Sequence, residues 1–466
     1  MALNNTELSI VLNEINDNQV ADTVNRAAVL KQILPQETGE INGRGVNVYA
    51  KVTKNPAMKW FGEGGTYPVG GNAGRVKMTA NYARLAISSQ LTRDVLEGAD
   101  KRAIINVVTD EVMGDTITAT QELSQQLYGD GSGVKAIVAS TDGAGNITFR
   151  TGVGDLTPDV ANYGNTYGTS LLLKNGRYNF VSGDGSSDRG TGGGTQSVAV
   201  GTVLTIAATS NVATLSSITS GSVAAFDDEP DDNYTLVDGD MIVFEGSYGI
   251  SVNGLNYHID SGTGTYQNVS RNTYSTLRCY VLNAANSALA VTQLYKLVFQ
   301  AKYLRAKNDV VDENYIMLSA PAQVHAYALL ADISVAGYNG SAAKTNLNVM
   351  PDAKKLDYGF TSFEFMGMRW IEDPHAPLHQ IFIIKPSKFK IHEFKPLGAV
   401  PLGGDSGFAP VPAFTSAGVG AYTDNAVYTM TWKGQLVTND PAKAGLKLTN
   451  LATSGLAVPT SGFALT

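Results

Sequence analysis

A chain of 466 residues is long enough for several domains and a substantial buried core. Its formal net charge is −8, from 34 basic and 42 acidic residues, which argues against tight or sequence-specific binding of nucleic acid. Charged residues make up only 16% of the chain, below the usual quarter, and this favours a protein that covers much of its surface with partners.

The N-terminal segment, from Asn5 to about Leu34, carries apolar residues every three or four positions. This spacing predicts one or two amphipathic helices. Pro35 ends the pattern, because its ring cannot continue a helix.

Two alternating runs follow, at 45–53 and 76–82, and each has the period of a half-buried strand. Between them lies the stretch WFGEGGTYPVGGNAG at 60–74, in which six glycines surround three aromatic residues. The sequence therefore predicts an extended hairpin whose tip is too long for a tight turn. A change of phase near Ala83 and Arg84 predicts a bulge at the end of the second strand.

The strongest helical pattern runs from Thr92 to Tyr128, with Thr92 as the expected N-cap and Gly129 as the expected C-cap. Such a helix would be roughly 55 Å long at about 1.5 Å per residue. Gly98 with Asp100 could kink it near its start. From about 134 to 269 the chain becomes rich in Gly, Ser, Thr and Asp, which predicts a β-rich region.

Helical spacing returns from Val291 to Lys307, followed by a strand, NYIMLSA, and a helix, PAQVHAYALLADI. Three further strand candidates are FEFMGMRWIED, IFIIKPSKFKIHEF and AVYTMTWKGQLVTND. The sequence as a whole predicts an α+β fold with a mixed or antiparallel sheet.

The glycine-rich stretch does not match a nucleotide-binding loop. Gly65 and Gly70 have the spacing of a phosphate-binding loop, but Gly71 and Asn72 stand where Lys and Ser or Thr are needed. The dinucleotide pattern fails as well, since Tyr67 occupies the place of its third glycine. A flexible arm that carries aromatic rings is the remaining interpretation, and no cofactor is predicted.

No catalytic group is predicted. The GDSG sequence at 404–407 is similar to the nucleophile motif of trypsin-like proteases, but none of the five histidines has the context of their catalytic base. Cys279 is the only cysteine, which excludes an internal disulfide and a cysteine-rich metal site. A turn is the expected structure of the GDSG stretch.

No metal site is predicted either. His375 and His379 have a spacing that metal sites use on helices, but Pro374 and Pro377 argue for a turn. The acidic run at 227–232 lacks the residue order of a calcium-binding EF-hand loop. The N-terminus has no secretory signal, and no stretch approaches the roughly 18 apolar residues of a membrane span.

The order of these elements resembles the major capsid proteins of tailed bacteriophages, which have the Hong Kong ninety-seven fold. The stretch VNVYAKVT…WFGEGGTYPVGGNAG…RLAISSQLT is similar to that family's extended loop, and QELSQQLYGDGSG to the end of its spine helix. GLNYHIDSGTGTYQNVSRNTYSTL resembles the entry to the central body, and EDPHAP with IFIIKPSKFKIHEF resembles a late strand pair. The resemblance covers nearly the whole chain and includes no invariant motif.

The resemblance implies a phage capsid fold with peripheral and axial domains and an added β-rich insertion. The implied parts are an N-terminal arm at 1–45, an extended loop at 46–90, a peripheral domain with the spine helix at 91–134, the insertion at 135–274, the axial domain with part of the peripheral domain at 275–420, and a return strand with the C-terminal tail at 421–466.

The implied function is self-assembly into hexamers and pentamers of an icosahedral head shell around double-stranded DNA, without catalysis. Trp60, Phe61 and Tyr67, with Lys59 beside them, would make the inter-subunit contact of the extended loop, because aromatic rings supply large contact areas. Some relatives link such a lysine to an asparagine of a neighbour. No matching asparagine is found for Lys59, so no crosslink is predicted.

The implied partners are further copies of the chain, a separate scaffolding protein, a portal and a decoration protein. DNA would be enclosed without sequence-specific binding, and no membrane contact is expected. The implied location is the virion capsid, with the host cytoplasm during assembly.

Other functions remain open at this point. A tail tube, sheath or decoration protein would share the low charge and many strands, although a long helix after a glycine-tipped hairpin argues against these proteins. A β-rich glycoside hydrolase would need a pair of carboxylates. A carbohydrate-binding surface protein would use residues 135–274 as its binding module.

Overall fold

A computed structural model describes residues 29–38, 45–92, 101–141, 146–149, 172–173, 177–182, 200–206, 212–215, 238–244, 246–307, 315–336, 354–355, 361–399, 408–415 and 418–452. Several sequence-based expectations lie outside these residues: the helices before residue 29, the kink at Gly98 and Asp100, the acidic run at 227–232 and the GDSG stretch at 404–407. The described structure mixes helices and strands and confirms the α+β class.

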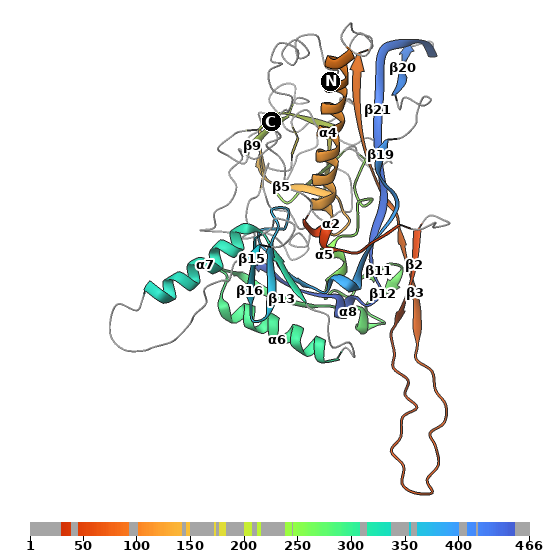
Figure 1. Ribbon diagram of the computed structural model, residues 1–466, viewed down its shortest axis with the longest axis vertical. Coiled ribbons are helices and arrows are strands. Elements are labelled where there is room, and N and C mark those ends of the chain that lie inside the picture. The colour runs from red at the N-terminus through yellow and green to blue at the C-terminus, as the bar shows by residue number, and fades with distance from the viewer. Residues whose placement is uncertain are drawn as a thin grey trace.

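A seven-stranded mixed sheet forms the lower part of the body in Figure 1. Its strands, in spatial order, are β13 (Tyr280–Ser287), β22 (Gly445–Leu451), β18 (Ile381–Ile384), β14 (Ile316–Ser319), β17 (Met368–Glu372), β16 (Thr361–Phe365) and β15 (Lys354–Lys355). β22, the last strand of the described residues in chain order, lies parallel to β13 and antiparallel to β18. Every residue of β14 and β18 is buried, because both faces of the sheet are covered.

Helices α6 (Val291–Lys307) and α7 (Pro321–Ala336) supply the core on one face of this sheet. Leu294, Leu297 and Val298 of α6 are buried there, at the spacing that puts them on one side of a helix. They share a cluster with Trp370 of β17. Both helices begin where the sequence predicts, and α7 has Pro321 in its first turn.

A second sheet contains five strands and lies beside a long helix in the upper part of Figure 1. The strands are β1 (Gln36–Thr38), β19 (Phe389–Ala399), β21 (Gly418–Thr438), β20 (Phe408–Thr415) and β4 (Ala83–Thr92). The helix α4 (Lys101–Gln126) packs against it. Ser89 of β4 donates a hydrogen bond to Asp115, and Thr116 reaches Met430 of β21, which fixes the helix to the sheet.

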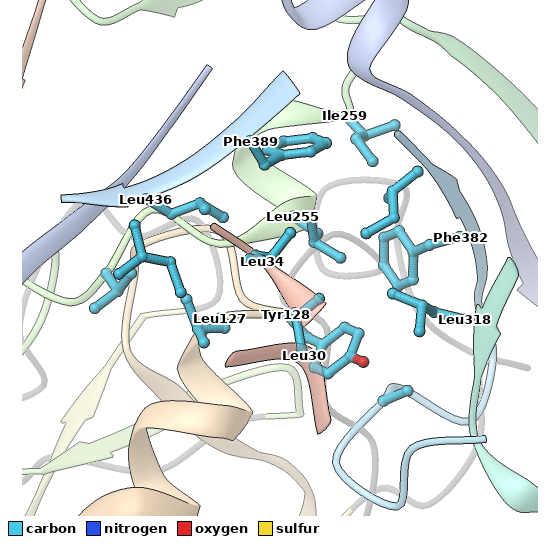
Figure 2. Close-up of a cluster of buried hydrophobic side chains, with 14 of the residues drawn as sticks. Leu30, Leu34, Leu127, Tyr128, Leu255, Ile259, Leu318, Phe382, Phe389 and Leu436 are labelled. Atoms are coloured by element: carbon cyan, nitrogen blue, oxygen red, sulfur yellow. The ribbon is translucent and has the colours of Figure 1, made fainter. Parts of the chain in front are cut away.

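A buried apolar cluster joins the two sheets (Figure 2). Its side chains come from the short helices α2 (Val29–Ile33) and α5 (Leu255–His258), from the end of α4 and from strands of both sheets. Figure 2 shows Tyr128 among Leu30, Leu255, Leu318 and Phe382. The Tyr128 hydroxyl donates to Asp373 at 2.7 Å, so the ring is held by a polar contact as well as by packing.

Six further strands close into a small barrel. They are β5 (Val134–Thr141), β6 (Asn146–Phe149), β7 (Arg177–Val181), β8 (Val200–Ile206), β9 (Val212–Leu215) and β10 (Met241–Phe244). The buried Lys135 of β5 forms an ion pair with Glu122 of α4, and this pair attaches the barrel to the helix. The β-rich character of this region matches the sequence-based expectation, whereas the boundaries of an insertion at 135–274 remain a prediction.

The remaining elements are short, apart from a hairpin that leaves the body. The hairpin consists of β2 (Gly45–Lys51) and β3 (Arg75–Asn81), and near its base lie β11 (Thr265–Tyr266), β12 (Val269–Ser270) and the 3-10 turn η2 (Ser275–Leu277). A second 3-10 turn, η3 (Pro386–Lys388), and the helix α8 (Pro441–Ala444) precede β19 and β22.

The start and end of the long helix differ from the sequence-based expectation. Thr92 is not an N-cap, because it is the last residue of β4 and pairs with Asn425 of β21. The helix ends at Gln126, and Gly129 does not take the left-handed conformation of a C-cap, which Gly131 and Gly133 adopt instead. Pairing across the sheet overrode the local helical pattern at Thr92.

Three strand predictions also needed correction. FEFMGMRWIED is two strands, β16 and β17, joined by a tight turn in which Met366 and Gly367 have φ of +52° and +80°. IFIIKPSKFKIHEF divides at η3, so that β18 and β19 belong to different sheets. The expected bulge near Ala83 is a break between β3 and β4, where the chain leaves the hairpin for the five-stranded sheet.

Candidate functional site

The β2–β3 hairpin and its tip project away from the body as the longest extension in Figure 1. The strands pair in antiparallel register from Gly45 opposite Asn81 to Lys51 opposite Arg75. Ala50 and Met78 face the body and are buried, whereas the alternate positions face outward. The predicted alternation is therefore confirmed, and it gives the hairpin one anchored face and one free face.

A small apolar cluster fastens the hairpin to the body. Ala50, Val52 and Met78 pack against Tyr266, Val269 and Leu277. The backbone N–H of Thr79 donates to the carbonyl of Gln267 at 3.1 Å. Gln267 and Asn268 have φ of +46° and +67°, so they form the two-residue turn that joins β11 to β12 and rests on β3.

Arg271 holds together residues 257–279, the anchoring segment on which the hairpin rests. Its guanidinium donates to Asp260 at 2.8 Å and to the carbonyl of Tyr257 at 2.8 Å, and it lies 4.5 Å from the centre of the Tyr266 ring. A buried arginine with a carboxylate, a carbonyl and a ring as partners leaves the segment little freedom to move. The base of the hairpin is thus rigidly positioned.

The loop from 52 to 74 begins with a backbone latch. The N–H of Val52 donates to the carbonyl of Gly74 at 3.0 Å, and the N–H of Gly74 donates to the Thr53 hydroxyl at 2.7 Å. A Cβ on Gly74 would lie 2.5 Å from that hydroxyl oxygen, which explains why glycine fits here. The latch sets the direction in which the loop leaves the two strands.

A turn at 62–65 forms the tip. The N–H of Gly65 donates to the carbonyl of Gly62 at 2.9 Å, and Gly64 has φ of +78°, the value that a type II turn requires at its third residue. Phe61 and Tyr67 flank the turn with ring centres 5.0 Å apart in an edge-to-face arrangement. The two rings therefore stiffen the tip without any support from the body.

The aromatic residues that the sequence singles out lie exposed on this loop, and Trp60 is the most exposed large apolar residue of the described chain. Trp60 is 99% exposed, Tyr67 is 80% exposed, and Phe61 is about half exposed because it contacts Tyr67. Two residues that the sequence reading did not select, Met58 and Val69, are similarly exposed. In the sequence, their apolar character within a glycine-rich loop was the signal that could have identified these two residues. Together these five side chains form the apolar tip.

Lys59 lies next to the apolar tip and bonds across the loop. Its Nζ donates to the carbonyl and the hydroxyl of Thr66, at 3.4 Å and 3.3 Å. These contacts bring the two sides of the loop together below the turn. The geometry gives Lys59 a structural contact within its own chain, and its role at a subunit contact remains a prediction.

The anchoring segment also contains a buried histidine and the single cysteine. His258 donates through Nε2 to the carbonyl of Leu436 at 3.0 Å and accepts at Nδ1 from the Tyr266 hydroxyl at 2.7 Å, and burial lowers its pKa to about 3. Burial raises the pKa of Cys279 to about 12, and the thiol donates to backbone carbonyls. A neutral thiol that donates to backbone carbonyls, and an imidazole with both nitrogens engaged, have the character of core packing, not of a nucleophile and its base.

His375 and His379 lie in the turn between β17 and β18, as the two prolines suggest. His375 Nδ1 is 3.2 Å from Asp373, whereas His379 is fully buried and its carbonyl accepts from the N–H of Leu451. Within the described residues, no group of three His, Cys, Asp or Glu side chains has a geometry that could hold a metal ion.

Lys447 of β22 is a second buried ionisable group near the junction of the sheets. Its Nζ donates to the side-chain carbonyl of Asn256 at 2.9 Å. Burial lowers the pKa of Lys447 to about 8, although the nearby Asp260, Cys279 and Asp130 act in the opposite direction. The charged form of Lys447 is therefore less stable in the folded chain than it is in water.

No helix in the described part of the chain has both the length and the apolar character that a membrane crossing requires. No protein-family model matches the chain, and no curated protein matches it in sequence.

Several solved structures match most of the chain. The chain is similar to the capsid asymmetric unit of Cyanophage A-1(L), at 10% identity and a TM-score of 0.49, over 96% of this chain and 99% of that one. It is similar to the capsid of a native GTA particle at 10% identity and a TM-score of 0.41, over 94% and 96%. A further match is the SrpI encapsulin complex of Synechococcus elongatus PCC 7942, at 9% identity and a TM-score of 0.40, over 97% and 98%.

Proposed function

We propose that this chain is a major capsid protein that assembles into the icosahedral head shell of a tailed bacteriophage. In this proposal hexamers and pentamers of the chain enclose double-stranded DNA without reading its sequence. The role is structural rather than catalytic. The resemblance noted in the sequence and the arrangement of the described elements both support it.

The apolar tip is the observation that carries the proposal. A soluble monomer has no physical reason to hold five large apolar side chains on a glycine-rich arm away from its own core. Covering such groups by another molecule stabilises the complex, because burial of apolar surface is the main favourable contribution to association. An arm with a rigid base and an exposed tip suits a contact with the next subunit.

The parts of the chain would have the roles that the resemblance implies. The β2–β3 hairpin would be the extended loop, α4 with the five-stranded sheet would form the peripheral domain, and the seven-stranded sheet with α6 and α7 would form most of the axial domain. The small barrel would belong to an insertion. These assignments are consistent with the order of the elements along the chain.

The further partners are a separate scaffolding protein, a portal and a decoration protein. The protein would reside in the capsid of the virion and would be assembled in the host cytoplasm. Its net charge of −8 suits a container that DNA enters by force instead of by attraction.

The test is electron microscopy of the expressed chain after gradient sedimentation, with and without the scaffolding gene expected beside it. The intact chain is compared with a shortened variant, in which an Asn-Gly turn replaces residues 54–72 and joins the strands of the hairpin without the apolar tip. The intact chain is expected to form closed shells or rings of five or six subunits. The shortened chain is expected to fold and to remain unassembled.

Regular tubes from the intact chain would favour a tail protein and overturn the capsid proposal. A compact monomer under both conditions would overturn any self-assembling role. If both the intact and the shortened chain formed shells, the extended loop would not be needed for the contact between subunits, and that part of the proposal would be overturned.

A further inference from the structure

The outward face of the β2–β3 hairpin is lined with cations. The register sets Lys51 opposite Arg75 and Tyr49 opposite Lys77, and all four side chains are exposed on the face that points away from the body. Tyr49 is 65% exposed. We call these four residues the cationic face. No carboxylate belongs to β2 or β3.

The cations of the cationic face have no ion-pair partner among the described residues. Elsewhere in the described chain, Lys31, Lys135, Arg271, Lys390 and Lys443 each contact a carboxylate. Like charges that lie directly opposite each other on neighbouring strands destabilise the pair. The cross-strand pair of Lys51 and Arg75 therefore carries a repulsion that a negative partner would relieve.

The charge of the hairpin is opposite to that of the rest of the chain. Residues 45–81 contain five basic residues and one acidic residue, Glu63, which gives a net charge of +4. Because the whole chain has a net charge of −8, the remaining residues carry −12. The rest of a second copy thus has a net charge of opposite sign to that of the hairpin, which favours their association.

We propose that the cationic face docks onto an acidic surface of a second copy of this chain, next to the contact made by the apolar tip. This inference rests on the proposed function and adds the chemistry of the partner surface. The tip supplies apolar contact area, and the cationic face orients the arm and speeds its approach. Packaged nucleic acid is the other anionic candidate, but the continuity of the face with the apolar tip favours protein.

The first experiment measures the lowest protein concentration at which shells form, in nucleic-acid-free buffer at low and high salt. For the unaltered chain this threshold is expected to rise about tenfold between about 0.05 M and about 0.5 M NaCl, because salt screens exposed charges. In Lys51→Glu/Arg75→Glu the threshold is expected to be higher at low salt and to fall as salt is added. The control Lys51→Arg/Arg75→Lys keeps the charge and should behave as the unaltered chain.

The second experiment joins amines to carboxylates directly. Shells assembled from equal amounts of ¹⁵N-labelled and unlabelled chains are treated with a carbodiimide, digested and examined by mass spectrometry. Peptides that link Lys51 or Lys77 to an Asp or Glu with mixed isotopes are expected, since mixed isotopes arise only between two copies.

Each outcome has a separate meaning. Shells whose threshold is the same in the Glu variant and the unaltered chain would overturn the cationic contact and leave the capsid proposal intact. A charge effect that appears only when DNA is added would assign the face to nucleic acid and overturn the contact between copies. Absence of shells from the unaltered chain under all conditions would overturn the proposed function itself.

Discussion

Truncation of Trp60 should separate assembly from folding. The side chain is 99% exposed and makes no contact that would stabilise the unassembled chain. Trp60→Ala is therefore expected to leave the free energy of unfolding of the subunit unchanged to within about 0.5 kcal/mol. Any larger effect of the variant must arise from the contact with a neighbour.

The magnitude follows from the exposed surface. A large aromatic side chain buries about 150–250 Å² when it is fully covered, and each Å² of apolar surface contributes about 25 cal/mol. Full burial of Trp60 would thus contribute about 4–6 kcal/mol to the contact, and truncation to alanine would remove about 3–5 kcal/mol of it. This loss corresponds to a roughly 10²- to 4 × 10³-fold weaker contact between two subunits.

The assay is the fraction of protein in shells, measured by sedimentation over a series of concentrations. Trp60→Ala is expected to raise the threshold concentration strongly, and Trp60→Phe to raise it less, because phenylalanine keeps a ring in the same place. Urea unfolding of unassembled subunits serves as the control for folding. Shells of Trp60→Ala at the threshold of the unaltered chain would refute the idea that this ring is covered on assembly.

Three further outcomes are expected. Met78→Ala removes a fully buried anchor of the hairpin and should lower the free energy of unfolding by about 2–5 kcal/mol. Val69→Ala, an exposed control on the same hairpin, should change it by less than about 0.5 kcal/mol, and equal effects of the two would refute the anchoring role. Gly74→Ala brings a Cβ to 2.5 Å from the Thr53 hydroxyl and should speed amide exchange of Val52, whose N–H donates to the carbonyl of Gly74; an unchanged exchange rate would contradict the steric role of Gly74. The lowered pKa of Lys447, about 8 against an ordinary 10.5, means that the unfolded state binds more protons between these pH values, so stability rises with pH there. The stability of the unaltered chain relative to Lys447→Met should therefore increase by about 2 kcal/mol from pH 7 to pH 10, and a constant difference in urea unfolding would refute the shift.

Much of the fold follows from local patterns. The alternation of Val46, Val48 and Ala50 predicts β2, and the helical spacing after Val291 predicts α6 at its observed bounds. Both signals are strong because each element buries one face against a core that lies close by. The aromatic residues of the apolar tip could also be predicted to be exposed, because they lie in a long glycine-rich loop that has no periodic pattern of a buried helix or strand.

Other features depend on contacts that a single sequence does not reveal. The pairing of β4 with β21 places Thr92 in a strand, although the residues after it have helical spacing. The closure of β5 to β10 into a barrel depends on pairings between strands that are far apart in the chain. The cationic face was hidden for the same reason, because Lys51 and Arg75 become neighbours only in the register of the hairpin.

The position of β22 has a consequence for biosynthesis. This strand, at 445–451, lies between β13 and β18 inside the seven-stranded sheet, and Tyr280 pairs with Leu446. A nascent chain that is still attached to the ribosome before this point has a gap in the sheet and two unpaired strand edges. The sheet can close only after β22 has been translated. Fragments that end before β22 therefore lack a complete sheet, and in the proposed capsid role they would be excluded from assembly.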